Sequence, residues 1–346
     1  MALTTLVTTA LLWPFDISSA AIQAPKAPVF RELGSLPAPG FFENIAIRPS
    51  TSSLLATRLT GGPEVYIVKD PASSTPDFSL LATVPDLDVL LGIDQLIPDE
   101  EACAGEERVY VVVGGKTPTG SPFDMVVGSA ALYTVTFPHL DNDEDVEVAH
   151  LSALSADTGL VNGLVAVPGG VLIADSLRSR VSFYNVTDNS FTESAYEYPE
   201  MTAPEGAAMF GINGVQIRDN HLYWSNTALS SIYRIALDDN KKEGCDVRPE
   251  LVFNASSIAS AVDDFNFDIY GNIYAATHFD GTIVYSDAQT GEMKVVAGGI
   301  GEWDLAGCTA LEFGKGEYDQ DTLYVTTNSA TFGNETRGGR IVAVDF

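Results

Sequence analysis

Six polar residues recur at nearly regular intervals and could together form one chemical site. They are Glu43, Asp94, Asn162, Asn213, Asp263 and Thr309, with successive separations of 51, 68, 51, 50 and 46 residues. Carboxylate and amide oxygens are the ligands that hard cations prefer, and Glu43, Asn162, Asn213 and Asp263 offer both. If these side chains converge, they predict a site for calcium or another divalent cation. Alternatively, the asparagines satisfy backbone groups.

Each of these residues begins an apolar segment with the pattern of a β-strand. Residues 162–175, 213–226 and 263–276 each hold an apolar stretch, a turn of Gly, Asn or Asp, and a second apolar stretch. A further strand is expected after each, and the same pattern follows the other three polar residues. Repeats of this kind are typical of antiparallel sheets with about four strands. Six such sheets predict an all-β, six-bladed β-propeller whose polar residues ring one end of the central channel.

A propeller of this size forms one domain, which we expect over residues 21–346 after a signal peptide at residues 1–20. Residues 1–15 are apolar and uncharged, and small residues at 18–20 suit cleavage. The stretch is short for a membrane span, and its alternative interpretation is an N-terminal strand. Glycosylation sequons begin at Asn185, Asn254 and Asn334. Together these features predict a glycoprotein that is secreted or stays in the lumen of the secretory pathway.

Charge and cysteine content narrow the range of partners. The chain has 18 basic and 47 acidic residues, a net charge of −29. Phosphate and anionic lipid would be repelled, so neither a nucleic-acid partner nor a membrane surface is expected. Cys103, Cys245 and Cys308 allow at most one disulfide; the first two lie in predicted loops, and Cys308 is expected to be buried. The acidic run at 141–147 is predicted to be a solvated turn.

Large apolar side chains lie close in sequence to the polar residues. They are Phe41, Phe42, Met209, Phe210, Phe265, Phe279 and Trp303. These residues predict either the wall of a pocket for small lipophilic substrates or ordinary core packing. Possible hydrogen-bond donors to a substrate are Asn162, Asn213, Thr309, His278 and the Trp303 indole. For His278 a structural position in a blade is the preferred interpretation, and Asp94 is expected in the same ring.

The chain resembles the gluconolactonase and luciferin-regenerating-enzyme superfamily of six-bladed propellers over roughly residues 30–346. Glu43, Asn162-Gly, Asn213-Gly and Asp263, followed by Asp268 and Gly271, carry the resemblance. It implies that Glu43, Asn162, Asn213 and Asp263 hold a divalent cation and that Asp263 acts as general base on lactones. The chain departs from the family pattern at Phe42-Glu43-Asn44, where the family has a Gly-flanked Glu, and at Asp264, where it has a small residue.

Three sequence segments resemble those of a fungal natural-product subgroup of this superfamily. They are Phe41-Phe-Glu-Asn-Ile-Ala-Ile-Arg-Pro, Phe210-Gly-Ile-Asn-Gly-Val-Gln-Ile-Arg and Ala276-Thr-His-Phe-Asp-Gly-Thr-Ile-Val. The subgroup includes secreted hetero-Diels–Alderases, which join an o-quinone methide from a tropolone or polyketide precursor to a humulene-type terpene. The resemblance therefore implies a pericyclase of meroterpenoid biosynthesis.

Three function classes remain open from the sequence. A pericyclase needs two partners held in reacting geometry and donors to the quinone-methide oxygen, with no required cofactor. A calcium-dependent lactonase would use Asp263 as base beside the cation. A non-enzymatic propeller would bind a partner on its rim. The aromatic residues, the Asp264 departure, the expected export signal and the subgroup segments favour the pericyclase, with Asn162, Asn213 and Asp263 as candidate catalytic residues.

Overall fold

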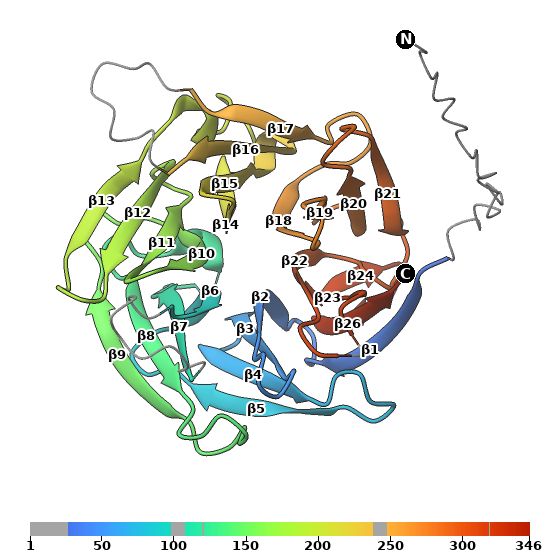
Figure 1. Ribbon diagram of the computed structural model, residues 1–346, viewed down its shortest axis with the longest axis horizontal. Coiled ribbons are helices and arrows are strands. Elements are labelled where there is room, and N and C mark those ends of the chain that lie inside the picture. Colours follow the sequence, from blue (N-terminus) through green and yellow to red (C-terminus); the bar gives the residue numbers. More distant parts are fainter. Residues whose placement is uncertain (1–26, 98–107, 120, 238–247, 318) are drawn as a thin grey trace, which may run out of the picture.

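Six four-stranded antiparallel sheets surround a central channel, which confirms the all-β, six-bladed β-propeller (Figure 1). This computed structural model describes residues 27–97, 108–119, 121–237, 248–317 and 319–346. Within those ranges the helical segments are three short 3-10 turns, η1 (Pro122–Asp124), η2 (Pro199–Met201) and η3 (Thr227–Leu229). No helix in the same ranges is long and apolar enough to cross a membrane.

The first five blades each use four strands that are consecutive in the chain. Blade 1 contains β2 (Phe41–Ile47), β3 (Leu54–Thr60), β4 (Glu64–Lys69) and β5 (Asp77–Thr83); blade 2 contains β6 (Val89–Gln95), β7 (Val109–Gly115), β8 (Ala131–Thr136) and β9 (Glu147–Ala153). Blade 3 contains β10 (Val161–Val167), β11 (Gly170–Asp175), β12 (Arg180–Asn185) and β13 (Phe191–Tyr196). Blade 4 contains β14 (Ile212–Arg218), β15 (His221–Asn226), β16 (Ser231–Ala236) and β17 (Glu250–Asn254); blade 5 contains β18 (Val262–Phe267), β19 (Ile273–Thr277), β20 (Thr282–Ser286) and β21 (Met293–Gly298).

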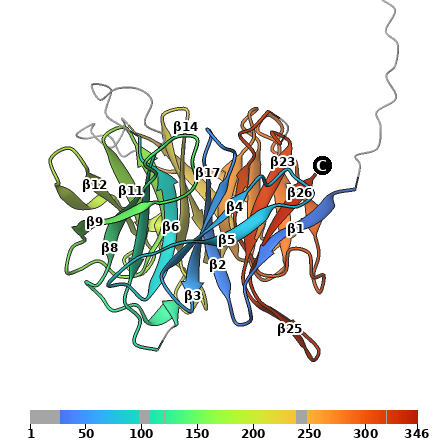
Figure 2. The ribbon, with the colours of Figure 1, turned by 90° about the horizontal axis from the view of Figure 1, so that it is seen from below.

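Blade 6 closes the ring with strands from both ends of the chain. β22 (Cys308–Phe313), β23 (Thr322–Thr327) and β26 (Arg340–Asp345) are joined at the outer edge by β1 (Val29–Ser35). Residues Val29 and Asp345 are opposite each other in the antiparallel pair of β1 and β26. The hairpin of β24 (Ala330–Phe332) and β25 (Glu335–Arg337) extends from one face of the molecule (Figure 2). Pairing the two chain ends hides strand edges that would otherwise be open.

A β-bulge interrupts the innermost strand of every blade at the same place. Two residues of each inner strand fall between consecutive partners of the next strand, namely Glu43-Asn44, Leu91-Gly92, Asn162-Gly163, Asn213-Gly214, Asp263-Asp264 and Thr309-Ala310. A bulge re-aims the side chains that it contains. The equivalent position in blade 2 is therefore Leu91, and the prediction that Asp94 belongs to the same ring is wrong.

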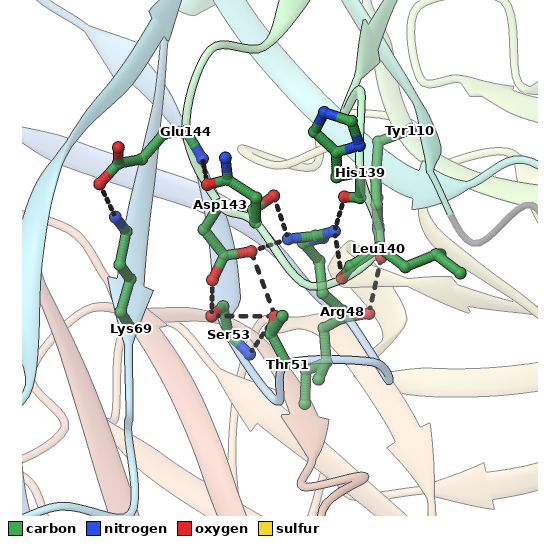
Figure 3. A network of polar contacts seen from close by, with 11 residues as sticks. Arg48, Thr51, Ser53, Lys69, Tyr110, His139, Leu140, Asp143 and Glu144 are labelled. Atoms are coloured by element: carbon green, nitrogen blue, oxygen red, sulfur yellow. Dashed lines mark hydrogen bonds and ion pairs between the residues drawn. The ribbon is translucent and has the colours of Figure 1, made fainter.

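Apolar side chains fill the space between neighbouring blades, and one buried ion pair also joins blades 1 and 2. The acidic run at 141–147 is largely exposed, as predicted, but Asp143 turns inward and pairs with the fully buried Arg48 (Figure 3). Asp143 also accepts a hydrogen bond of 2.5 Å from the Ser53 hydroxyl, and the Arg48 guanidinium lies 3.7 Å above the centre of the Phe137 ring. This part of the run is an interblade contact rather than a solvated turn.

Cys308 is buried and free, as expected, and burial raises the pKa of its thiol to about 12. Cys103, Cys245 and the predicted signal peptide at residues 1–20 lie outside the described residues.

Candidate functional site

One mouth of the channel opens into a cavity of about 740 Å³ whose floor carries the four predicted cation ligands. Glu43 comes from β2, Asn162 from β10, Asn213 from β14 and Asp263 from β18, each at the first position of its bulge. All four residues line the cavity, and each residue as a whole is at most 8% exposed. The repeat therefore brings together residues that are up to 220 positions apart in the chain, since 263 − 43 = 220.

Hydrogen bonds fix the orientation of the Asn213 amide on this floor. Asn213 Nδ2 donates to Asp263 Oδ1 at 2.6 Å and to Thr227 Oγ1 at 3.0 Å. An amide nitrogen has two hydrogens, so both are used and the carbonyl oxygen is left for a ligand. Asn162 Nδ2 donates to Ser176 Oγ over a longer 3.4 Å. Asn213 is thus a candidate acceptor in this arrangement, and Asn162 is the better candidate donor.

The charged form of Glu43 is unfavourable at the floor of the cavity. Within the described ranges its buried Oε2 has no hydrogen-bond partner. Burial first, and then the nearby carboxylates of Asp263 and Asp264, raise the pKa of Glu43 well above its ordinary value. Binding of either a proton or a cation would offset the free energy of burying the Glu43 carboxylate.

The four floor residues fit a hard divalent cation. The unpartnered Glu43 oxygen, the Asp263 carboxylate and the Asn213 carbonyl are oxygen donors, and Asn162 adds a fourth. Across the described residues no three His, Cys, Asp or Glu side chains form a metal cluster, so a cation at this floor would depend on the two amides. Calcium binding stays a prediction.

A second polar layer lies beneath the floor, at the next position of the bulges. Asn44 Nδ2 donates to Asp264 Oδ2 at 3.0 Å, which links blade 1 to blade 5 across the channel. Burial raises the pKa of Asp264 to about 7, with a further contribution from Asp263. The bulge of blade 4 has Gly214 here, where an added Cβ would be 2.2 Å from Asp264 Oδ1. Asn44 and Asp264, the two positions that the sequence resemblance singled out, are therefore partners of each other.

His278 stands beside Asp263 at the cavity wall. Its Nδ1 lies 3.2 Å from Asp263 Oδ2, and its ring is 6.0 Å from Phe41 and 5.4 Å from Phe279 between centroids. Among the described residues no hydrogen-bond acceptor is aligned with this buried nitrogen. Placement in the cavity favours a role towards a ligand over the purely structural alternative.

Apolar side chains form the rest of the cavity wall. Leu59, Leu91 and Leu160 line it on the side of blades 1 to 3, and Phe41, Met209, Phe210 and Phe279 line it nearer the rim. Phe123 in η1 stacks on Phe210 with ring centroids 5.6 Å apart. The sequence pattern did not reveal Phe123, because it lies in a connection with no strand periodicity, and it did not reveal the leucines.

Two of the aromatic residues predicted as substrate contacts lie in the core instead. Phe42 packs against Tyr66 with ring centroids 5.5 Å apart, and Phe265 packs against Phe267 at 5.8 Å. Both are fully buried and neither lines the cavity. The reason is the bulge, since each precedes or follows the bulged pair and points between blades.

Three further predicted contacts also lie away from the cavity. Thr309 holds the correct ring position, but its hydroxyl lies 2.9 Å from the Phe42 carbonyl and is used there. The Trp303 ring packs against Phe332 at 4.5 Å. Asp94 lies at the opposite mouth of the channel, in a cavity of about 300 Å³, where it accepts a hydrogen bond of 2.8 Å from the Ala166 amide. None of the three can contact a ligand in the larger cavity without rearrangement.

Two relatives match most of the chain, and each is named "putative hetero-Diels-Alderase". The protein from Phoma sp is 29% identical over 322 residues, which cover 84% of this chain and 84% of that protein. The protein from Sarocladium schorii is 26% identical over 333 residues, covering 88% of this chain and 79% of that one. No protein-family model matches the chain.

Solved structures of propellers share the fold at low identity. A luciferin-regenerating enzyme superposes with a TM-score of 0.61 at 15% identity, covering 92% of this chain and 96% of that chain. A gluconolactonase from Xanthomonas campestris gives 0.58 at 12% identity, covering 92% and 89%. The chain is therefore a six-bladed propeller with the fold of gluconolactonase and luciferin-regenerating enzyme. More narrowly, the chain is similar over most of its length to two proteins named putative hetero-Diels-Alderase, as the sequence resemblance predicted.

Proposed function

We propose that this protein is a hetero-Diels–Alderase of secondary metabolism that joins an o-quinone methide, made from a tropolone or polyketide precursor, to a humulene-type terpene. The homologues support the reaction class. The observation that carries the proposal to this chain is the cavity, which combines a polar floor with walls of leucine and phenylalanine. Small apolar ligands bind in such cavities, where a few polar groups fix their orientation. A meroterpenoid would be the product.

The proposed reaction needs positioning more than proton transfer. The exocyclic carbon and the oxygen of the quinone methide each form a bond to one carbon of the alkene, and the ring recovers its conjugation. No atom leaves, so no base is consumed. Holding the two reactants together removes much of the entropic barrier. Asn162 or His278 could donate a hydrogen bond to the oxygen as negative charge develops on it.

A bound cation would assist without being required for bond formation. Glu43, Asn162, Asn213 and Asp263 are the residues that would hold it, and it would supply positive charge near the oxygen-bearing substrate. In this chain those residues orient one another through the Asn213–Asp263 hydrogen bond. Their role under this proposal is to shape and charge the floor.

A calcium-dependent lactonase is the second candidate. It is favoured by the placement of Asp263 beside Glu43, Asn162 and Asn213 at the cavity floor, where a carboxylate could act as a base. The cycloaddition is preferred because the surrounding wall is apolar and because the homologues carry that name.

Replacing Asp263 with asparagine separates these two functions. The purified protein is assayed with an o-quinone methide generated in the presence of a humulene-type alkene, and in parallel with a panel of simple lactones, before and after chelation. We expect cycloadduct formation, with Asp263→Asn retaining most of it. Lactone hydrolysis that is lost both in this variant and on chelation would favour the lactonase. Loss of cycloaddition in a folded Asp263→Asn protein that is unaffected by chelation would point to acid–base chemistry.

A further inference from the structure

We infer that the cavity binds its two reactants on fixed sides, with the alkene against blades 1 to 3 and the oxygen-bearing ring against blades 4 to 6, and that Leu91 determines this arrangement. The inference rests on the proposed function, because it assigns places to the two partners of that reaction. It concerns specificity rather than bond formation.

Leu91 is the single apolar residue at the six equivalent bulge positions. The other five blades place Glu43, Asn162, Asn213, Asp263 and Thr309 there. Leu91 lines the cavity, and its carbonyl accepts a hydrogen bond of 2.5 Å from Thr57 Oγ1, which fixes the backbone at this point. Blade 2 therefore interrupts the polar ring with an aliphatic side chain.

The aliphatic surface around Leu91 is continuous. Leu59 and Leu160 belong to the same packed cluster and also line the cavity. Phe41 of blade 1 packs against that cluster, and so does Phe210, which lies just before β14 at the border with blade 4. The stacking of Phe123 on Phe210 extends the surface towards the rim. A hydrocarbon gains free energy by leaving water for such a surface, whereas an oxygen placed there would lose its hydrogen bonds.

The opposite side of the cavity can satisfy oxygen atoms. Asn213, Asp263, His278, Asn328 and Ser329 line it, and they come from blades 4, 5 and 6; the apolar residues of these blades, Met209 and Phe279 among them, line the cavity nearer the rim. The oxygen-bearing ring would find its polar partners on this side, and Glu43 and Asn162 flank Leu91 at the border. The two surfaces face each other across one cavity, so the two reactants would be bound side by side.

The test measures the binding of each partner separately. The probes are α-humulene for the alkene and tropolone for the oxygen-bearing ring, and their dissociation constants are measured by ligand-observed NMR on the full chain. Leu91→Asn should weaken α-humulene binding about tenfold, which is the usual effect of spoiling an apolar subsite, and should change tropolone binding by less than about twofold. Leu91→Ile, which keeps the volume and apolar character, should leave both nearly unchanged. His278→Leu should instead weaken tropolone binding and leave α-humulene binding nearly unchanged.

Three results would overturn the inference: equal loss of both probes in Leu91→Asn, selective loss of tropolone, or no loss of α-humulene. If Leu91→Asn does not fold, Leu160→Thr places a hydroxyl in the same aliphatic surface and is expected to give the same selectivity. Failure of the proposed function is distinguishable, because it appears as absent cycloaddition in the unmodified protein. Cycloaddition without selective binding loss would contradict the assignment of sides alone.

Discussion

The hydrogen bond between Asn44 and Asp264 joins inner strands of two blades that are not neighbours in the ring. The sequence resemblance singled out both positions, and the structure shows that the two residues are hydrogen-bond partners. The amide of Asn44 gives the buried carboxylate a donor, and Gly214 leaves room for it. Such a pair, beneath the floor of the cavity, links two inner strands across the channel.

Asp264 gives the first prediction, which concerns pH. A carboxyl of this type has a pKa of about 3.9 in an unfolded chain, whereas burial raises the pKa of Asp264 to about 7 in the folded protein. Between these values the folded state binds more protons, so the free energy of unfolding should fall as pH rises from about 4 to about 7. Asp264→Asn should make this fall shallower, by at most about 1.4 kcal/mol per pH unit.

Urea unfolding at several pH values between 4 and 8 measures this effect. Asp219→Asn is the matched control, because it makes the same substitution at a side chain that is 81% exposed. Glu43 adds a fall of the same sign in every variant, since the pKa of Glu43 is also raised. Parallel curves for Asp264→Asn and the unmodified protein would show that this carboxyl does not titrate in that range.

The unpartnered Glu43 oxygen gives the second prediction. If a cation completes the floor, calcium at a hundred times its dissociation constant should stabilise the protein by about 2.7 kcal/mol. Glu43→Gln removes a charged ligand and the cost of burying it, so it should abolish the calcium effect while leaving the calcium-free protein at least as stable. Thermal unfolding with and without calcium measures both. A melting temperature that does not respond to calcium in either protein would argue for a protonated Glu43 instead.

At the scale of the element, the inner-strand bulge sets both the position and the direction of the floor residues. Gly214 shows how closely the bulges approach one another, since an added Cβ there would be 2.2 Å from Asp264 Oδ1. Gly214→Ala should therefore cost about 2–4 kcal/mol of unfolding free energy by overpacking or by displacing the buried carboxylate.

Gly291→Asn serves as the control for this third prediction. Gly291 has a φ of +71°, which asparagine tolerates, and nothing within 4 Å of the added Cβ position. Its cost should stay below about 1 kcal/mol. Chemical unfolding of both variants gives the comparison. Equal stability of Gly214→Ala and the unmodified protein would mean that the inner strands can move apart without penalty.

The bulge also explains which parts of the site were predictable. The repeat of strands and polar residues predicted six blades and placed Glu43, Asn162, Asn213 and Asp263 on one floor. It failed in blade 2, because a search for polar residues selects Asp94 over Leu91. The extra residue in a bulge also reverses the alternation of side chains along the strand. The sequence alone therefore could not show that Phe41 faces the cavity and Phe42 the core. Phe123 depends on a connection whose path no periodic pattern encodes.

At the scale of the whole molecule, closure by β1 and β26 makes the two ends of the chain part of one blade. From the sequence, the N-terminal region was predicted as a leader followed by the propeller, without a strand in blade 6. Pairing of β1 with the last strand is a long-range contact. The sequence of a short apolar segment does not indicate which strand it will pair with. The ion pair between the buried Arg48 and Asp143, which joins blades 1 and 2, was unpredictable for the same reason. The two residues are 143 − 48 = 95 positions apart in the chain.

The outer surface of the molecule gives the last prediction, which tests export. Asn254 and Asn334 are exposed, at the end of β17 and between β24 and β25, and Asn185 ends β12. Asn185 is only partly exposed, whereas the other two are exposed, and a more exposed asparagine is more accessible to the glycosylation machinery. Local hydrogen bonds do not distinguish Asn185 from Asn254, because the side-chain oxygen of each accepts from residues that follow it in the chain. If the chain is secreted, expression in a eukaryotic host should place glycosylated protein in the medium, with Asn254 and Asn334 occupied more completely than Asn185. Mass spectrometry before and after endoglycosidase treatment measures the occupancy, and Asn334→Gln should remove one glycan without changing stability, since its hairpin lies outside the blades. Unglycosylated protein retained inside the cells would contradict both the export signal and the assignment of the sequons, and would leave the cavity chemistry to be tested in a different compartment.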